Sequence, residues 1–183
     1  MNKNYFVLFV LLILLCGFGQ NSIAEKGDKK MSIKVTSSAF NEGGMIPAKY
    51  TCDGLNISPS LKWQQTPQGV KSIALICDDP DAPVGNWVHW VMWNIPAEAN
   101  RLPEAVPASP QLPDGSKQGI SDFRKPGYGG PCPPSGTHRY YFKIYALDTM
   151  LDLPDSSTKQ DLIVAMKGHI LAEGSLMGKY RRK

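Results

Sequence analysis

Hydrophobic and polar residues alternate along three stretches of the chain, and each predicts a β-strand. Residues 72–79, 87–95 and 138–147 have the period of two that places successive side chains on opposite faces of a sheet. Apolar residues occupy both faces of the first two stretches, so we expect central strands covered on two sides, as in a β-sandwich. Shorter strands are predicted at 32–36 and 60–63.

The alternation also predicts which side chains share a face. One face of the second stretch is expected to carry Trp87, His89, Val91, Trp93 and Ile95. One face of the third stretch is expected to carry His138, Tyr140, Phe142, Ile144 and Ala146.

One helix is predicted near the C-terminus. Thr158 and Asp161 resemble an N-terminal capping box, with Asp in place of the usual Glu or Gln. Residues at helical spacing follow: Leu162, Ala165, Met166, His169 and Ile170. His169 is therefore assigned to packing, and residues 173–180 are predicted to form a short final strand.

Proline is confined to the middle of the chain. All fifteen prolines lie between Pro47 and Pro154, and residues 96–134 show no convincing period. A loop of that length is unusual unless it covers a core or carries function. The predicted fold class is mainly β, an antiparallel β-sandwich with a C-terminal helix and long proline-rich loops.

The first 24 residues read as a signal peptide. Lys3 precedes an unbroken apolar run over 5–15, and Ser22 and Ala24 supply small residues for cleavage before Glu25. The run is shorter than the roughly 20 residues that span a bilayer, so no stable membrane insertion is expected after cleavage. Residues 25–183 would then form one domain of an exported protein, periplasmic or secreted.

Lipoprotein processing at Cys16 is the alternative. It is disfavoured because the preceding residue, Leu15, is large where such a signal requires a small one.

Charge argues against a nucleic-acid partner. The formal net charge is +4, and removal of Lys3 with the signal leaves 19 − 16 = +3. The terminal residues 179–183 form the one basic run, which is typical of a frayed end.

Three cysteines remain after cleavage, which permits one disulfide in an oxidising compartment. Cys77 lies in an apolar run, whereas Cys52 and Cys132 lie in turn-rich segments and are the favoured pair. The sequence does not fix their separation. The cysteine spacings match no zinc site, and no metal is expected.

Several aspartates and histidines are candidates for chemistry. Asp79 and Asp81 lie in "DPDAP", which also reads as an ordinary turn. A lone histidine such as His89 is more often a core residue, whereas His138 opens a strand after the rigid segment 131–134, with Tyr140 on the same face.

Three kinds of site are compatible with these residues. A metal site lacks HxH or HExxH spacing, and a serine hydrolase lacks GxSxG. The third is an anion site in which histidine, tyrosine and glycine-rich backbone N–H groups donate hydrogen bonds.

Two motifs narrow this choice. "DPDAP" followed by "WVHW", together with "GPCPPSGTHRY", resembles the phosphatidylethanolamine-binding protein family. The segments "YTCDGLNISPSLKW" and "GHILAEGSLMGKY" are similar to its bacterial branch, the Raf kinase inhibitor-like proteins, and the likeness covers roughly 33–182.

The resemblance implies a sandwich of two antiparallel sheets with a small anion pocket near one end. The residues that it implies for the pocket are Asp79, Asp81, His89, Gly130, Pro131, His138 and Tyr140. Arg139 accompanies them, and we expect it to pair with one of the aspartates and so to relieve the cost of a buried charge. The segment "PCPP" is longer than the proline pair of animal members, and a signal peptide would separate this chain from cytosolic kinases.

The function predicted from the sequence is therefore non-enzymatic binding of a small anion or phospholipid headgroup, without a cofactor. Histidine protonation is expected to strengthen binding as the pH falls toward about 6. The main alternative is a protein-interaction role, as an inhibitor of a protease, kinase or other host enzyme, and a hydrolase ranks last. The physiological ligand, any protein partner and the oligomeric state, including a homodimer, are left open.

Overall fold

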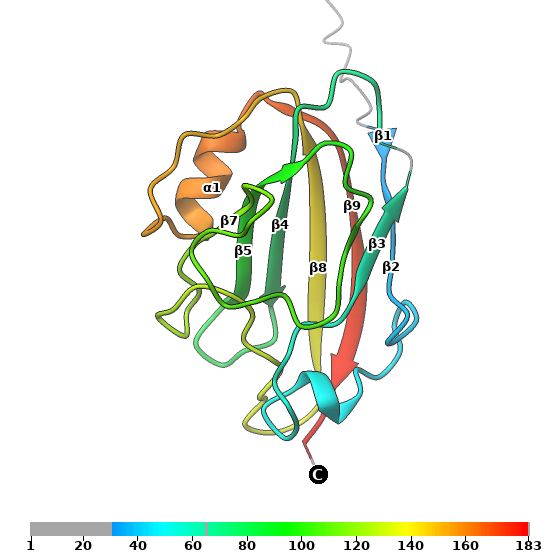
Figure 1. Ribbon diagram of the computed structural model, residues 1–183. Coiled ribbons are helices and arrows are strands. Elements are labelled where there is room, and N and C mark those ends of the chain that lie inside the picture. The colour runs from blue at the N-terminus through cyan, green and yellow to red at the C-terminus, as the bar shows by residue number, and fades with distance from the viewer. Residues whose placement is uncertain (1–30, 65, 183) are drawn as a thin grey trace, which may run out of the picture.

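Two β-sheets of unequal size form the framework of the protein (Figure 1). The computed structural model describes residues 31–64 and 66–182, so the predicted signal peptide and Cys16 lie outside the described residues. The larger sheet has the strand order β1-β9-β8-β4-β5-β7 and the smaller one β2-β3-β6. The strands are β1 (Met31–Ser32), β2 (Lys34–Thr36), β3 (Leu61–Gln64), β4 (Ser72–Asp79), β5 (Trp87–Pro96), β6 (Arg101–Leu102), β7 (Lys117–Gln118), β8 (His138–Leu147) and β9 (Ile170–Tyr180).

The strand pairings are antiparallel except for that of β1 with β9, which is parallel. A short 3-10 helix, η1 (Ala48–Tyr50), and one α-helix, α1 (Lys159–Met166), complete the elements of the described residues. The predicted fold class is confirmed. No helix within residues 31–64 and 66–182 combines the length and apolar character needed to cross a bilayer.

The central strand β4 is buried at every position, as its two apolar faces predict. Ile73, Leu75 and Cys77 belong to the core between the large and small sheets. Ala74 and Ile76 belong to a second core on the opposite face, which α1 covers with Leu162 and Met166. Figure 1 shows α1 lying beside β5 and β4, away from β2 and β3.

The helix is shorter than predicted and the final strand is longer. The capping box is present, with the Thr158 hydroxyl accepting from Asp161 N–H, but α1 ends at Met166. Gly168 has a φ of +84°, a left-handed conformation that ends a helix and that other residues rarely adopt. The assignment of His169 to helix packing is therefore wrong: it is exposed, and its Nδ1 lies 2.7 Å from Asp148 Oδ1.

The proline-rich segment 96–134 covers the inter-sheet core and contributes Leu102, Val106, Leu112 and Tyr128 to it. Gln118 holds part of this cover in place. Its Oε1 accepts a hydrogen bond from Trp90 Nε1, and its Nε2 donates to the carbonyl oxygens of Pro107 and Ser109. The segment is thus an ordered cover with two short strands, β6 and β7.

The predicted face of β5 is partly wrong because the strand is irregular at two points. Cys77 pairs with Trp90 and Asp78 with Val88, so His89 is an additional residue in a β-bulge. The alternation shifts there: Trp90 and Met92 face the inter-sheet core, whereas Val91 and Trp93 face the α1 side. A second shift in the register between β4 and β5 lies near Asn94, whose φ is +54°.

Candidate functional site

A pocket of about 420 Å³ opens at the end of the large sheet where β4 ends and β8 begins. Three polar side chains, Asp79, His89 and His138, line it from three different strands. The remaining wall is mostly apolar and includes Pro83, Val84, Trp87, Phe123, Pro133 and Pro134. The structure therefore brings together three of the predicted site residues within a largely hydrophobic cavity.

Asp79 and His138 form a buried pair. Asp79 Oδ2 lies 2.8 Å from His138 Nδ1, and the side chains are 4% and 9% exposed. Asp79 Oδ1 accepts a hydrogen bond from the backbone N–H of Asp81. Both carboxylate oxygens of Asp79 are thus engaged, and Nε2 is the imidazole nitrogen of His138 left for a ligand.

The bulge in β5 places His89 in the pocket. With Trp90 opposite Cys77, the additional residue His89 faces Tyr140 and Phe123, with ring centroids 5.2 and 5.3 Å away. Its Nδ1 lies 2.6 Å from the Gly129 carbonyl oxygen. A carbonyl oxygen can only accept, so Nδ1 carries the proton and Nε2 of the neutral ring is a bare acceptor.

Burial lowers the pKa of His89, although its bond to the Gly129 carbonyl and the nearby Asp79 act in the opposite direction. Desolvation disfavours the charged imidazolium, so His89 is neutral at pH 7 in the unliganded protein. A neutral His89 presents an acceptor at Nε2, whereas a hydrogen-bond donor was expected from the sequence.

Asp81 and Arg139 pair outside the pocket. Arg139 donates from Nε and Nη2 to the two oxygens of Asp81, at 2.9 and 2.6 Å, and its backbone N–H donates to Oδ2. These bonds lower the pKa of Asp81 to about 2. The expected pairing of Arg139 with an aspartate is present, but the buried carboxylate of Asp79 pairs with His138 rather than with Arg139. Asp81 and Arg139 line a neighbouring, open depression, which they share with His138.

Tyr140, a predicted ligand-binding residue, does not line the pocket but packs against His89, which does. It is buried, and its hydroxyl has no hydrogen-bond partner among the described residues. Burial, and after it the charge of Asp79, raises its pKa, so the phenol keeps its proton. Its ring packs edge-on against His89.

Gly130 and Pro131 support the wall and do not line the cavity. The N–H of Gly130 donates to Asn56 Oδ1, and that of Gly129 donates to the His89 carbonyl. A Cβ atom on Gly130 would lie 2.5 Å from the Tyr50 carbonyl oxygen, so the position requires glycine for close packing. The expectation that these glycine N–H groups face an anion is corrected, because both are already bonded within the fold.

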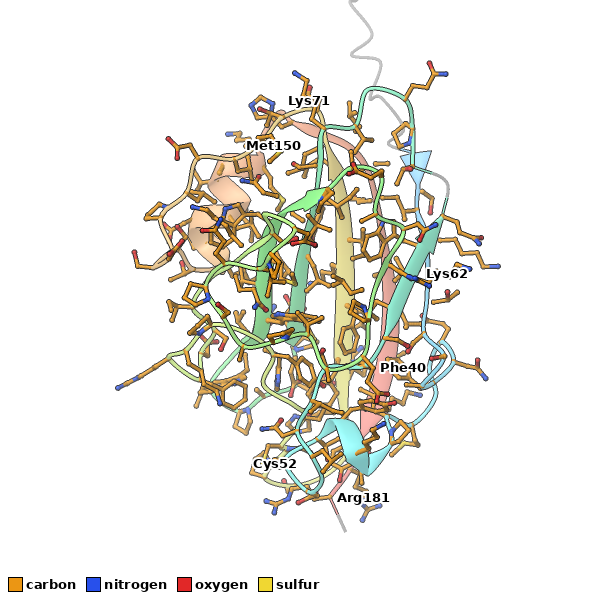
Figure 2. All side chains as sticks on the ribbon, in the orientation of Figure 1. Phe40, Cys52, Lys62, Lys71, Met150 and Arg181 are labelled. Carbon is orange, nitrogen blue, oxygen red and sulfur yellow. A yellow bond between two sulfur atoms is a disulfide. The ribbon has the colours of Figure 1, made fainter. Side chains whose placement is uncertain are left out.

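A disulfide joins Cys52 to Cys132, as predicted, with a Cα–Cα distance of 5.4 Å. Cys132 lines the pocket together with Pro133 and Pro134, and the disulfide connects this wall of the pocket to the turn that follows η1. Figure 2 shows Cys52 at the end of the molecule where the chain terminates. Within the described residues, Cys77 is the free cysteine, and it is buried.

The aromatic wall of the pocket, Trp87 and Phe123, was not predicted from the sequence. Trp87 and Phe123 pack edge-on at 5.6 Å. The alternation had placed Trp87 beside His89, which was a usable signal, but Phe123 lies in the aperiodic segment 96–134. Nothing local marks Phe123 as a pocket residue.

The described residues contain no cluster of three or more His, Cys, Asp or Glu arranged to hold a metal ion. The pocket is thus built from a carboxylate, two imidazoles and apolar side chains. Such a site can orient a small polar group by hydrogen bonds while apolar walls exclude water.

Comparison with known proteins gives consistent matches. The family model described as phosphatidylethanolamine-binding protein matches residues 36–181. A UPF0098 protein of Methanothermobacter thermautotrophicus is 55% identical over 150 residues, which cover 82% of this chain and 99% of the relative. A UPF0098 protein of Pyrococcus horikoshii is 47% identical over 161 residues, with 86% and 80% covered.

Two crystal structures share the fold. That of a phosphatidylethanolamine-binding protein homolog from Chlamydia trachomatis has a TM-score of 0.77 and 40% identity, covering 83% of this chain and 99% of its own. That of YbcL from E. coli, described as a member of the mammalian PEBP family, has a TM-score of 0.76 and 34% identity, again with 83% and 99% covered. The strands that converge on the pocket all lie within the matched range, and this chain belongs to the phosphatidylethanolamine-binding protein family.

Proposed function

We propose that this protein binds a small phosphoryl-type anion in the pocket between β4, β5 and β8, and that it does so without converting the ligand chemically. The observation that carries the proposal is the convergence of Asp79, His89 and His138 in a cavity of about 420 Å³. Apolar walls give such groups a low-dielectric setting, in which each hydrogen bond to a charged ligand is strengthened.

The lack of a hydroxyl, an amine or a free thiol in the cavity lining supports a binding role. The residues that line it include no Ser, Thr or Lys, and Cys132 is held in a disulfide. The Asp79–His138 pair would orient an acid or base in a hydrolase, but catalysis through a serine, threonine, lysine or cysteine nucleophile would need a side chain that this lining lacks.

The hydrogen bonds and charge states of the polar pocket residues indicate which protonation state of the ligand can bind. Asp79 is engaged with His138 and the Asp81 backbone, and His89 is neutral at pH 7 with a bare Nε2. A fully ionised phosphate finds hydrogen-bond donors there only if the imidazoles take up protons, whereas a phosphate that keeps a proton can itself donate to a bare Nε2. We therefore infer that the bound species is a phosphate or phosphate monoester that carries, or brings with it, a proton.

Calorimetric titration with inorganic phosphate and phosphoethanolamine tests this function. We expect saturable binding to the wild-type protein and a loss of about tenfold or more in affinity for His138→Ala, because a charge-assisted hydrogen bond is removed. His169→Ala is the matched control, since His169 is exposed and pairs with Asp148 outside the pocket. Absence of saturable binding, or equal affinity of the two variants, would contradict the proposal.

The same titration should depend on pH with a defined sign. Because burial lowers the pKa of His89, its imidazolium is scarce in the free protein at and above the ordinary histidine value of about 6.5. An anion stabilises that imidazolium, so affinity should rise as the pH falls from about 8 to about 5.5, with net proton uptake on binding. Buffers of different ionisation enthalpy measure the uptake, and an affinity that is flat over this range would count against the assigned role of His89.

Export is the second part of the proposal, and it rests on the N-terminal sequence pattern. We infer that residues 1–24 direct the chain out of the cytoplasm and are removed. N-terminal sequencing of protein recovered from the native source should begin at Glu25. A chain that begins at a lipid-modified Cys16 would support the lipoprotein alternative, and one that keeps Lys3 would argue against export.

A further inference from the structure

A second depression, of about 510 Å³, lies on the small sheet and is separate from the pocket. Its polar lining comes from Thr36, Ser37, Ser38, Ser60, Lys62 and Arg101. These residues belong to β2, β3 and β6 and to the segments that flank them. Figure 2 shows Lys62 on β3, on the side of the molecule formed by β2 and β3.

Two cations lie directly opposite each other in this depression. Lys62 pairs in register with Arg101 across β3 and β6, and with Thr36 across β2 and β3. All three are exposed, since the alternating partners Leu61, Trp63 and Leu102 point into the core. Like charges in directly opposite positions destabilise a sheet, so the arrangement is unfavourable without an anion between them.

The described residues supply no counter-ion for this pair. Neither Lys62 nor Arg101 takes part in an ion pair within residues 31–64 and 66–182. Glu104, three residues after Arg101, is engaged elsewhere, with Lys49 Nζ and the Tyr50 hydroxyl. The two positive charges are therefore available to a bound molecule.

Serine hydroxyls complete the lining and are held in place. Ser37 Oγ donates to the Ser60 carbonyl oxygen at 2.6 Å and accepts from the N–H of Ala39. Ser38 Oγ and Ser60 Oγ share one hydrogen bond of 2.7 Å. A hydroxyl has one donor and two acceptor positions, so this pair keeps one donor free for a ligand.

We propose that this depression is a second, independent binding site for an oxyanion of the phosphate-monoester class. Lys62 and Arg101 supply the charge, with the planar guanidinium of Arg101 suited to bind two oxygens of one phosphate. The serine pair supplies a neutral donor to a third oxygen. The site does not depend on His89, His138 or the proposed function of the pocket.

Nuclear magnetic resonance with inorganic phosphate as the probe, at constant ionic strength, tests the proposal. Backbone amide signals of residues 36–38, 60–62 and 101–102 should shift and saturate in the wild-type protein. The double variant Lys62→Gln/Arg101→Gln should lose about tenfold or more in affinity at these amides, because two charged donors are removed. His138→Ala should leave them unchanged, so failure at this site and failure at the pocket are distinguishable.

A matched pair of substitutions controls for overall charge. Lys71→Gln/Lys167→Gln also removes two positive charges, but from exposed positions outside the depression. Neither lysine pairs with an acid among the described residues. We expect this control to bind phosphate as the wild type does. An equal loss in both double variants, or shifts that do not saturate, would overturn the site in favour of general electrostatic attraction.

Stability and ligand source provide two further readouts. Without phosphate, Lys62→Gln/Arg101→Gln should melt no lower than the wild type, because a like-charge contact is relieved, and a lower melting temperature would contradict the unpaired state of these cations. Glycerol phosphate in solution and phosphatidic acid vesicles, both of which present a phosphate monoester, separate a soluble ligand from a lipid headgroup. Binding of either supports the oxyanion site, and binding of neither overturns it.

Discussion

Replacement of both disulfide cysteines, Cys52→Ser/Cys132→Ser, should lower the free energy of unfolding by about 4 kcal/mol, as loop-closure entropy predicts for a long loop. The bond spans 80 residues of sequence, from the turn after η1 to the wall of the pocket. Loss of the disulfide increases the conformational entropy of the unfolded chain more than that of the folded protein, because hydrogen bonds also hold the wall of the pocket in place. Equilibrium denaturation in urea measures the difference.

Those hydrogen bonds make the prediction specific. The N–H of Cys52 donates to the Pro131 carbonyl oxygen, the Tyr128 hydroxyl donates to the Tyr50 carbonyl oxygen, and Gly130 N–H donates to Asn56. The variant should therefore keep its folded structure and its phosphate affinity below the unfolding transition. A parallel loss of affinity in the folded protein would show that the disulfide shapes the pocket as well as limiting the unfolded chain.

Reductant supplies the control for this experiment. The wild-type protein should lose a similar amount of stability when it is reduced, whereas the double variant should not respond. Cys77 is fully buried and its pKa is raised by burial, so it remains an unreactive thiol in both proteins. A response of the double variant to reductant would mean that another cysteine reaction affects stability.

Asp78→Asn is expected to cost about 3 kcal/mol of folding stability, the lower end of the range for breaking a buried ion pair from one side. Asp78 has 1% of its side chain exposed and forms ion pairs with Lys143 on β8 and Lys159 on α1. The variant would leave two ammonium groups close together without a carboxylate. Both lysines keep some solvent contact, at 31% and 19% exposure, and this moderates the cost.

The effect of this substitution should depend on pH. Burial opposes ionisation of Asp78, but the hydrogen bonds from Lys143 and Lys159 outweigh it and hold its pKa below the ordinary value. The stabilisation is therefore fully present above the unfolded-state pKa of about 4 and is lost as the pH falls through the lower folded-state value. Wild type and variant should become nearly equal in urea unfolding at low pH.

Asp148→Asn is the matched control for Asp78→Asn. Asp148 also pairs with a basic side chain, His169, but both partners are almost half exposed. Exposed pairs contribute about 1 kcal/mol or less, so the control should change stability little. If Asp78→Asn cost no more than this control, or cost the same at pH 3 as at pH 7, the ion pairs would not be the source of its effect.

Much of the framework could be predicted because local sequence patterns reflect it directly. The alternation over residues 72–79 placed Asp78 and Asp79 on opposite faces, where the structure has them. Failures arose where one residue changed the local geometry. Gly168 ends the helix before His169, and the bulge at His89 shifts the alternation of β5.

The candidate site was predictable in part. The motifs carried by the family resemblance contain Asp79, His89 and His138, and these three line one cavity. Phe123 was not predictable, because its segment has no periodic pattern and its contact with His89 depends on how the chain folds back. Lys62 and Arg101 gave no signal either, since they are 39 positions apart in sequence and become neighbours only through β3–β6 pairing.

The sequence by itself determined the strand periodicity and favoured Cys52 and Cys132 as the disulfide pair, because side-chain polarity and turn residues act over a few positions. The pocket residues were indicated by the motifs of the family resemblance. Only the tertiary structure decided that His138 pairs with Asp79, that Arg139 is committed to Asp81, and that His89 offers an acceptor at Nε2. Such roles depend on which distant groups approach within hydrogen-bond distance, and strand register and a single bulge fix those approaches.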